Sequence, residues 1–241
     1  MAAKGGAVGF FDSGLGGLCI LDAFKALCPH ESTIYIADSK NCPYGNKPAA
    51  EIVKLAESNT RRLLRRGCKM VVVACNTATA AAIDFLRERH PEVPFIGIEP
   101  AVKPAALRSK TGVVGVLATA GTFGGRLYNE TKAKFAKSVT VLAVVADEFV
   151  SIVEGEREAV LRGEPLGVGA SAARIERVVR RRIEPLLKAG ADKIVLGCTH
   201  FPHLAPIIEK VCAGRAEVID PSLPVARQAV RILARLERGE P

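Results

Sequence analysis

Short apolar runs alternate with longer amphipathic segments along the whole chain. The short runs are rich in Val and Ile, as is typical of strands, and the longer segments repeat their apolar residues at helical spacing. Strands alternating with helices predict parallel β-sheets that are covered by helices on both faces. Strands are expected at residues 7–11, 32–38, 69–75, 94–98, 112–119, 139–146, 192–198 and 216–220, and helices at 16–28, 49–67, 77–90, 128–137, 148–163, 171–189, 203–214 and 224–239.

The two halves of the chain resemble each other weakly. AVGFFDSGLGG near the N-terminus is echoed by VVGVLATAGTFGG, and VVVACNTA is echoed in the same order by IVLGCTH. This echo predicts an α/β fold of two similar doubly wound parallel-sheet domains, with a site in the cleft between them. We expect a first domain from residues 1–97 plus 206–241 and a second from 98–205. The prolines of 91–104 would mark the crossing, and the last helix would return to the first domain.

Small polar and reactive residues follow the predicted strands. In folds of this kind ligands bind at the carboxyl ends of the strands. The predicted strand ends therefore point to one site, and they carry Asp12-Ser13-Gly14, Asp38, Cys75-Asn76-Thr77, Thr119 and Cys198-Thr199-His200.

Composition narrows the classes of function. The 241 residues contain no apolar run near the ~20 that a membrane helix needs, and the N-terminus lacks a secretory pattern, so a cytoplasmic protein without membrane contact is expected. The net charge of +9 could indicate nucleic-acid binding. However, most of the arginines of 174–188 lie opposite an apolar stripe at helical spacing, which is typical of a solvated helix face. A positive field would also attract a small anionic substrate.

Seven cysteines occur without a CxxC pair or an even spacing, so reduced thiols are expected rather than a disulfide framework or a structural zinc site. Cys75, Cys198 and His200 could bind a metal, but they offer only three ligands. The glycine-rich FDSGLGGL (11–18) could cradle a phosphate, although it lacks the Lys-Ser/Thr of a P-loop. Its alternative is a tight turn in which Asp12 or Ser13 caps a helix.

Cys75 and Cys198 each stand where a strand turns toward a predicted helix. The helix dipole there favours thiolate. Either cysteine alone could be a small buried residue, but their matched positions favour a shared role. Inverting a stereocentre needs a base on one face and an acid on the other, which two opposed thiols would supply without a cofactor. Asp12 and His200 could adjust the two thiols.

These residues resemble the cofactor-independent glutamate racemases of the aspartate/glutamate racemase superfamily. FDSGLGGL, PYG (43–45), ACNTA (74–78), GVLAT with GT (115–122) and GCTHFPHL (197–204) stand in the family's order. The resemblance implies a racemase that uses neither pyridoxal phosphate nor a metal, supplies D-glutamate for peptidoglycan and often forms homodimers. Related aspartate racemases tend to carry another residue where His200 stands.

The resemblance also assigns roles to residues. Cys75 and Cys198 would be the acid/base thiols, assisted by Asp12 and His200 respectively. In VADEFVSIVEGE (145–156) the family's usual Cys-Pro is absent, but FVSIVE aligns and makes Glu154 the counterpart of a catalytic Glu. The Arg that is common before PYG is also absent. The residues expected around the substrate are Asp12, Ser13, Pro43, Tyr44, Gly45, Asn76, Thr77, Thr119, Thr122, Thr199 and His200.

The sequence therefore predicts a glutamate racemase. Two alternatives stay open: a racemase of aspartate or another amino acid, and a basic nucleic-acid-binding module. Neither a nucleic acid nor a membrane is expected as a partner, whereas a homodimer is.

Overall fold

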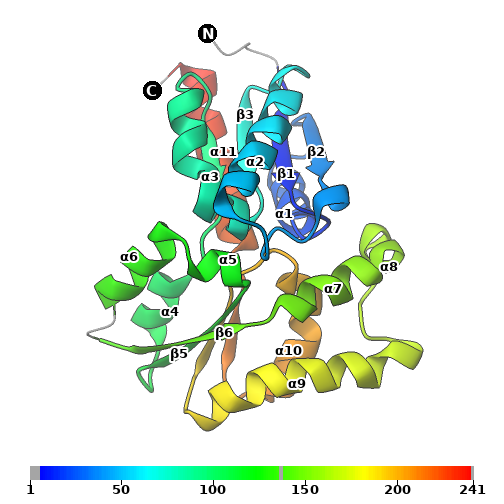
Figure 1. Ribbon diagram of the computed structural model, residues 1–241, viewed down its shortest axis with the longest axis vertical. Helices are drawn as coiled ribbons and strands as arrows, with labels where there is room; N and C mark the ends of the chain where they lie inside the picture. Colours follow the sequence, from blue (N-terminus) through cyan, green and yellow to red (C-terminus); the bar gives the residue numbers. More distant parts are fainter. Residues whose placement is uncertain (1–5, 136–137, 240–241) are drawn as a thin grey trace.

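The computed structural model describes residues 6–135 and 138–239. It contains two four-stranded sheets, one above the other in Figure 1, and every strand pair is parallel. The strands are β1 (Val8–Asp12), β2 (Thr33–Ala37), β3 (Met70–Val73), β4 (Phe95–Gly97), β5 (Val113–Ala118), β6 (Thr140–Val145), β7 (Lys193–Leu196) and β8 (Glu217–Ile219). Their order is β2-β1-β3-β4 in the first sheet and β6-β5-β7-β8 in the second, which confirms the predicted fold class.

The helices agree with the predicted ranges except in three places. The expected helix at 148–163 is divided at Glu156, and two short α-helices, α4 (Val102–Arg108) and α5 (Ala120–Phe123), were not predicted. The last two residues of the helix expected at 128–137 lie outside the described residues. The helices are α1 (Leu18–Leu27), α2 (Ala49–Leu64), α3 (Asn76–Arg89), α4 (Val102–Arg108), α5 (Ala120–Phe123), α6 (Arg126–Phe135), α7 (Asp147–Gly155), α8 (Arg157–Arg162), α9 (Ala172–Lys188), α10 (Ala205–Cys212) and α11 (Ser222–Arg238).

Each face of each sheet carries its own apolar core. Successive strand residues point to opposite faces, so Phe10 packs with residues of α1 and α11, whereas Phe11 packs with residues of α2 and α3. The second sheet is covered by α7, α9 and α10 on one face and by α4 and α6 on the other. Both sheets are therefore doubly wound, as the alternating pattern predicted.

The return of the chain to the first half occurs later than expected. Residues 206–219 were assigned to the first domain, but β8 pairs with β7 and completes the second sheet. Ile208 and Val211 of α10 are buried in the core of that sheet. Only α11 returns, as predicted, and packs against α1. The first five and last two residues of the expected first domain lie outside the described residues.

The two halves share one topology, which explains the sequence echo. The strand order of the second sheet repeats that of the first, so β3 and β7 occupy equivalent central positions. Cys75 and Cys198 follow these two strands. The strand ends therefore deliver the two cysteines from equivalent places in facing halves (Figure 1).

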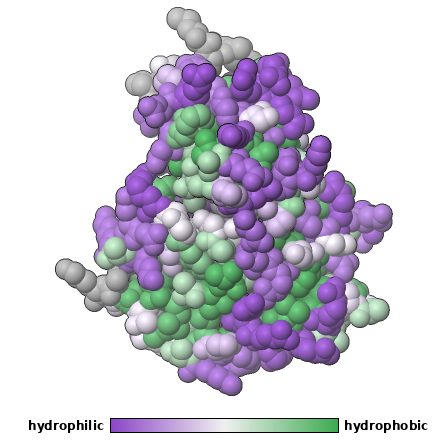
Figure 2. All heavy atoms as spheres, in the orientation of Figure 1, coloured by the Kyte–Doolittle hydropathy of each residue, from purple (hydrophilic) through white to green (hydrophobic). Residues whose placement is uncertain are grey.

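The outer surface separates polar from apolar residues. Hydrophilic residues dominate the upper half in Figure 2, whereas hydrophobic residues gather on the visible face of the lower half. Most arginines of α9 are exposed as predicted, and Arg180 pairs with Glu176 and Glu184 of the same helix, whereas the partly buried Arg182 pairs with Glu148 of α7. Among the described residues, no helix is long and apolar enough to cross a membrane.

Candidate active site

Cys75 is held by the start of helix α3. Its backbone is extended, and its sulfur accepts a hydrogen bond from the N–H of Ala78 at 3.4 Å, so that the thiol itself caps the helix. The side chain is 4% exposed. The Ser13 hydroxyl lies 3.7 Å from the sulfur. The thiol therefore lies beside the N-terminus of α3, where the first N–H groups of a helix have no intrahelical partner.

Asp12 ties the β1–α1 loop to the second half of the molecule. The carboxylate is fully buried and accepts hydrogen bonds from the N–H of Gly17 at 2.9 Å and from the Ser13 hydroxyl at 3.4 Å. The Thr199 hydroxyl, next to Cys198, donates to the same carboxylate at 3.5 Å. One buried charge thus stands between the two cysteine-bearing loops.

Cys198, His200 and Glu154 form a chain of contacts in the second half. The Cys198 sulfur lies 3.7 Å from Nδ1 of His200, and Nε2 of His200 lies 2.7 Å from Oε1 of Glu154. The N–H of Leu15, from the first half, donates to the same carboxylate oxygen at 2.7 Å. Burial raises the pKa of Glu154, but the hydrogen bonds from His200 and Leu15 outweigh it, so the net pKa is lowered. Glu154 is therefore an ionised partner for His200.

Both thiols are held in their neutral form by their surroundings. Burial, together with the nearby charge of Asp12, raises the pKa of Cys75 above its ordinary value, although the Ala78 N–H lowers it in part. Burial also raises the pKa of Cys198, with the charge of Asp12 again adding to the rise. The effect expected from the helix start is present at Cys75, but desolvation is larger.

Polar side chains line the other walls. The hydroxyls of Thr77, Thr119 and Thr122 form a cluster, with Thr77 and Thr119 at 2.8 Å and Thr119 and Thr122 at 3.0 Å. Asn76 donates weakly to the carbonyl of Ile98 at 3.5 Å, while its buried Oδ1 has no hydrogen-bond partner. A buried amide oxygen without a donor is costly, so it favours a ligand that brings one.

The 43–45 segment closes the site from the first half. The Tyr44 hydroxyl donates to Asp38 at 2.6 Å, and Asn59 donates to the tyrosine oxygen at 3.3 Å. A Cβ on Gly45 would come within 3.0 Å of Thr119, so glycine permits the close approach of the two halves here. The Cys42–Pro43 peptide bond is cis.

One cavity between the halves is lined by most of the predicted residues. Its volume is about 10 Å³. Asp12, Glu154 and Thr122 stand behind the wall, where they contact Ser13, His200 and Thr119 respectively. Val150 was not predicted, since nothing distinguishes it from the other apolar residues of α7. The lining residues are Ser13, Pro43, Tyr44, Gly45, Cys75, Asn76, Thr77, Thr119, Val150, Cys198, Thr199 and His200.

Residues 19–229 match the model of the Asp/Glu/Hydantoin racemase family. The chain belongs to this family. A glutamate racemase of Herpetosiphon aurantiacus is 44% identical over 234 residues, which are 97% of this chain and 87% of that protein. The matched residues include both cysteine-bearing loops, and the same two loops line the cavity.

Solved structures of glutamate racemases have the same fold as this family member. The structure of a Bacillus anthracis isoform aligns with a TM-score of 0.82 and 29% identity, covering 97% of this chain and 83% of that one. The Escherichia coli enzyme, solved with L-glutamate and an activator, aligns with a TM-score of 0.80 and 34% identity over 95% of this chain and 82% of its own. Each alignment includes both halves of the chain.

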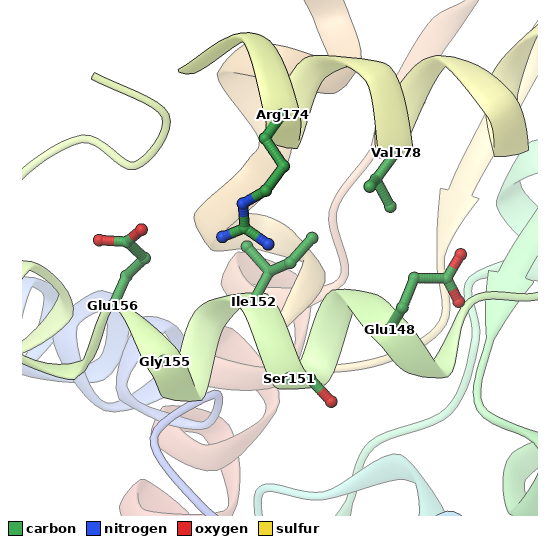
Figure 3. Close-up of a pocket in the computed structure, with 7 residues that line it drawn as sticks. All are labelled: Glu148, Ser151, Ile152, Gly155, Glu156, Arg174 and Val178. Carbon is green, nitrogen blue, oxygen red and sulfur yellow. The ribbon is translucent and has the colours of Figure 1, made fainter. Parts of the chain in front are cut away.

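A larger pocket of this racemase-family chain lies away from the cysteines. Its volume is about 270 Å³, and Figure 3 shows it between α7 and α9, with Arg174 pointing in from α9, Glu148 extending from α7 and Glu156 from the residue between α7 and α8. Its lining contains no cysteine or histidine. The paired thiols and the histidine therefore line the smaller cavity, not this one.

Proposed function

We propose that the chain is a glutamate racemase that interconverts L- and D-glutamate with two cysteines and no cofactor. The observation that carries the proposal is the pairing of Cys75 and Cys198 in one cavity, each presented by an equivalent strand end of facing halves. The named relatives and solved neighbours are glutamate racemases, which favours glutamate over aspartate as the substrate.

The proposed reaction needs one thiolate and one thiol. The thiolate takes the proton from Cα, and the electron pair of the C–H bond passes to the carbon and its carboxylate. The opposite thiol then gives its proton to the other face of the carbon, which inverts the centre and leaves a thiolate there. The reverse reaction exchanges the two roles.

The surroundings fit an amino acid in this place. The N–H groups at the start of α3 and in the turn after Thr199 would hold the α-carboxylate and stabilise the charge that develops on it. The unpartnered Asn76 Oδ1 would accept from the α-ammonium. That ammonium would also lower the pKa of both thiols, whose surroundings otherwise keep them neutral. Substrate binding thus helps to prepare the base.

Asp12 and His200 would assist the two thiols, and Glu154 would orient His200. Pro43, Tyr44, Gly45, Thr77 and Thr119 would complete the substrate's surroundings, with Thr122 supporting Thr119. In the cell, we further propose a cytoplasmic homodimer that supplies D-glutamate for peptidoglycan. Size-exclusion chromatography with light scattering tests the dimer.

Proton NMR and circular dichroism with L-glutamate in D₂O, without added cofactor, test the activity. We expect loss of the α-proton signal together with decay of optical activity. Cys75→Ala and Cys198→Ala should each lower the rate at least ~10²-fold, because general acid–base groups contribute about 10²–10⁴-fold each. Cys28→Ala, at the end of α1, is the matched control and should keep the parent rate.

Two results would redirect the proposal. Turnover of aspartate but not glutamate would keep the chemistry and change the substrate. No turnover of either, together with salt-sensitive retention of DNA in a gel shift, would favour the nucleic-acid-binding alternative.

A further inference from the structure

Three side chains with metal-binding atoms meet beside the cavity. A carboxylate oxygen of Glu154, a ring nitrogen of His200 and the sulfur of Cys42 all lie within 4.8 Å of one another. They come from three separate segments: helix α7, the turn after β7 and the loop before Pro43. Within residues 6–135 and 138–239 no second group of three such residues meets this distance.

We propose that Cys42, Glu154 and His200 form a zinc-binding site through which Zn²⁺ inhibits the enzyme. Thiolate, imidazole and carboxylate are the three ligand types that zinc takes in proteins, at about 2.0–2.3 Å. Nδ1 of His200 faces Cys198, so Nε2, which already faces Glu154 at 2.7 Å, is the coordinating nitrogen. A water molecule would occupy the fourth coordination position of the zinc ion.

The backbone beneath the cluster leaves room for it. A Cβ on Gly14 would collide with Oε1 of Glu154 and would lie 3.2 Å from the Cys42 sulfur. Glycine therefore lets both side chains settle over the β1–α1 loop. The Leu15 N–H fixes Oε1 at 2.7 Å, while Oε2 has no hydrogen-bond partner among the described residues. That oxygen is free to coordinate.

Solvent reaches two of the three ligands more readily than it reaches the cysteines of the cavity. The Glu154 side chain is 20% exposed and Cys42 is also partly exposed, whereas His200, Cys75 and Cys198 are buried. A zinc ion can therefore meet Glu154 and Cys42 from solvent and reaches the buried ring of His200 from there. On binding, the Cys42 S–H bond breaks, its proton goes to solvent and the sulfur bonds to zinc, without any change in oxidation state.

Bound zinc would occupy the groups that serve Cys198. Glu154 would exchange its contact with His200 for a bond to the metal, and His200 could no longer carry a second proton. The inhibition thus rests on the proposed racemase function, whereas the binding does not. The two can be separated by measuring them apart.

Zinc affinity is measured on the purified full chain by competition with a chromogenic chelator. We expect one Zn²⁺ per chain, and an affinity at least ~10-fold weaker in Cys42→Ser, since one of three protein ligands is lost. Cys28→Ser is the matched control and should bind like the parent. Equal affinity in Cys42→Ser and the parent would overturn the site, and so would no binding by the parent.

Cobalt gives a measurement that does not depend on the variant's folding. Co²⁺ added to the parent and to Cys28→Ser should show a thiolate-to-cobalt charge-transfer band, and its absence from the parent would contradict Cys42 ligation. In parallel, Zn²⁺ should inhibit glutamate racemisation by the parent, chelator should restore it, and Cys42→Ser should resist inhibition. Cys42-dependent binding in a chain without racemase activity would uphold the site and remove the proposed function.

Discussion

At the scale of single residues, one buried carboxylate affects the pKa of both thiols. Asp12 adds to the rise in pKa of Cys75 and of Cys198, after the larger effect of burial. The same carboxylate accepts the Gly17 N–H, which an amide oxygen could also accept. Removing the charge while keeping this contact therefore isolates the electrostatic part of its role.

Asp12→Asn should move thiol ionisation to lower pH and yet slow racemisation. The loss of the negative charge lowers the pKa of both thiols, so alkylation by iodoacetamide should reach half its plateau rate at a lower pH than in the parent. Racemisation should fall at least ~10-fold, because a group that assists proton transfer is lost. Mass spectrometry gives the site of alkylation. Asp22→Asn, on the exposed face of α1, is the control, and an unchanged alkylation profile in Asp12→Asn would contradict this account.

Most of the site could be predicted residue by residue because short motifs mark the strand ends. Cys75, Thr119, Cys198 and their neighbours line one cavity, as those motifs indicated. The proximity of Cys42 to Glu154 and His200 could not be read from the sequence, since it joins three distant segments. Contacts of this kind depend on side-chain direction rather than on spacing.

At the scale of elements, glycines in the β1–α1 loop allow the second half of the molecule to pack closely against it. A Cβ on Gly14 would collide with Glu154, and a Cβ on Gly16 would lie 2.6 Å from the backbone nitrogen of His200. The loop can therefore pack against α7 and the turn after β7. Larger residues would push these elements apart.

Gly14→Ala should lower kcat strongly without unfolding the protein. The added methyl displaces Glu154 from His200, and a misplacement of about 1 Å can cost ~10²-fold in rate. Thermal unfolding should show a loss of about 1–3 kcal/mol from the crowded loop. Gly155→Ala is the control: nothing lies within 4 Å of its added carbon, and it should stabilise α7 by at most about 1 kcal/mol. Equal rates in both variants would refute the role of the loop.

Asp192 joins the end of α4 to the start of β7. It accepts hydrogen bonds from the Ser109 hydroxyl and the Lys110 N–H, each at 2.6 Å. Burial opposes its ionisation, but these hydrogen bonds and the charge of Lys193 outweigh burial and hold the pKa at about 2, below the ordinary 3.8. A lowered carboxyl pKa stabilises the fold above pH 3.8, and that contribution disappears as the pH falls toward 2.

Asp192→Asn should therefore destabilise the fold at neutral pH by on the order of 1–2 kcal/mol. Urea unfolding at pH 7 and at a series of acid pH values measures the difference from the parent. We expect the two stability curves to converge below pH 3.8. A constant separation would show that packing, not charge, is responsible.

Element prediction succeeded where the pattern is periodic and failed where breakers interrupt it. All eight strands were predicted because each is a compact apolar run between polar turns. Helix α4 was missed because Pro104 suggested a linker, but it occupies the first helical turn, where its missing N–H costs nothing. The break at Glu156 was missed because the apolar spacing continues past Gly155, the glycine that ends α7.

At the scale of the whole molecule, the sequence echo predicted two facing halves but not how closely they meet. Contacts cross between them at several points: Thr199 to Asp12, Leu15 to Glu154, and Thr77 to Thr119. A cavity of about 10 Å³ holds roughly one water molecule. An amino acid is many times larger, so its entry requires the halves to separate.

The ion pair between Asp84 of α3 and Arg126 of α6 is one contact that this opening must break. The two charges lie 2.6 Å apart across the halves, and both side chains are exposed. Exposed pairs contribute little to stability because solvent screens them, so Arg126→Ala should raise the population of open molecules by no more than ~5-fold. Iodoacetamide reaches Cys75 and Cys198 only in open molecules, and their alkylation, followed by mass spectrometry, should accelerate by the same factor.

Arg162→Ala removes ion pairs to Glu158 and Glu164 within the second half and is the control. Saturating glutamate should protect both thiols in every variant. If Arg126→Ala and Arg162→Ala are alkylated at the same rate, the α3–α6 contact does not restrain opening, and access to the cavity lies along another edge of the two halves.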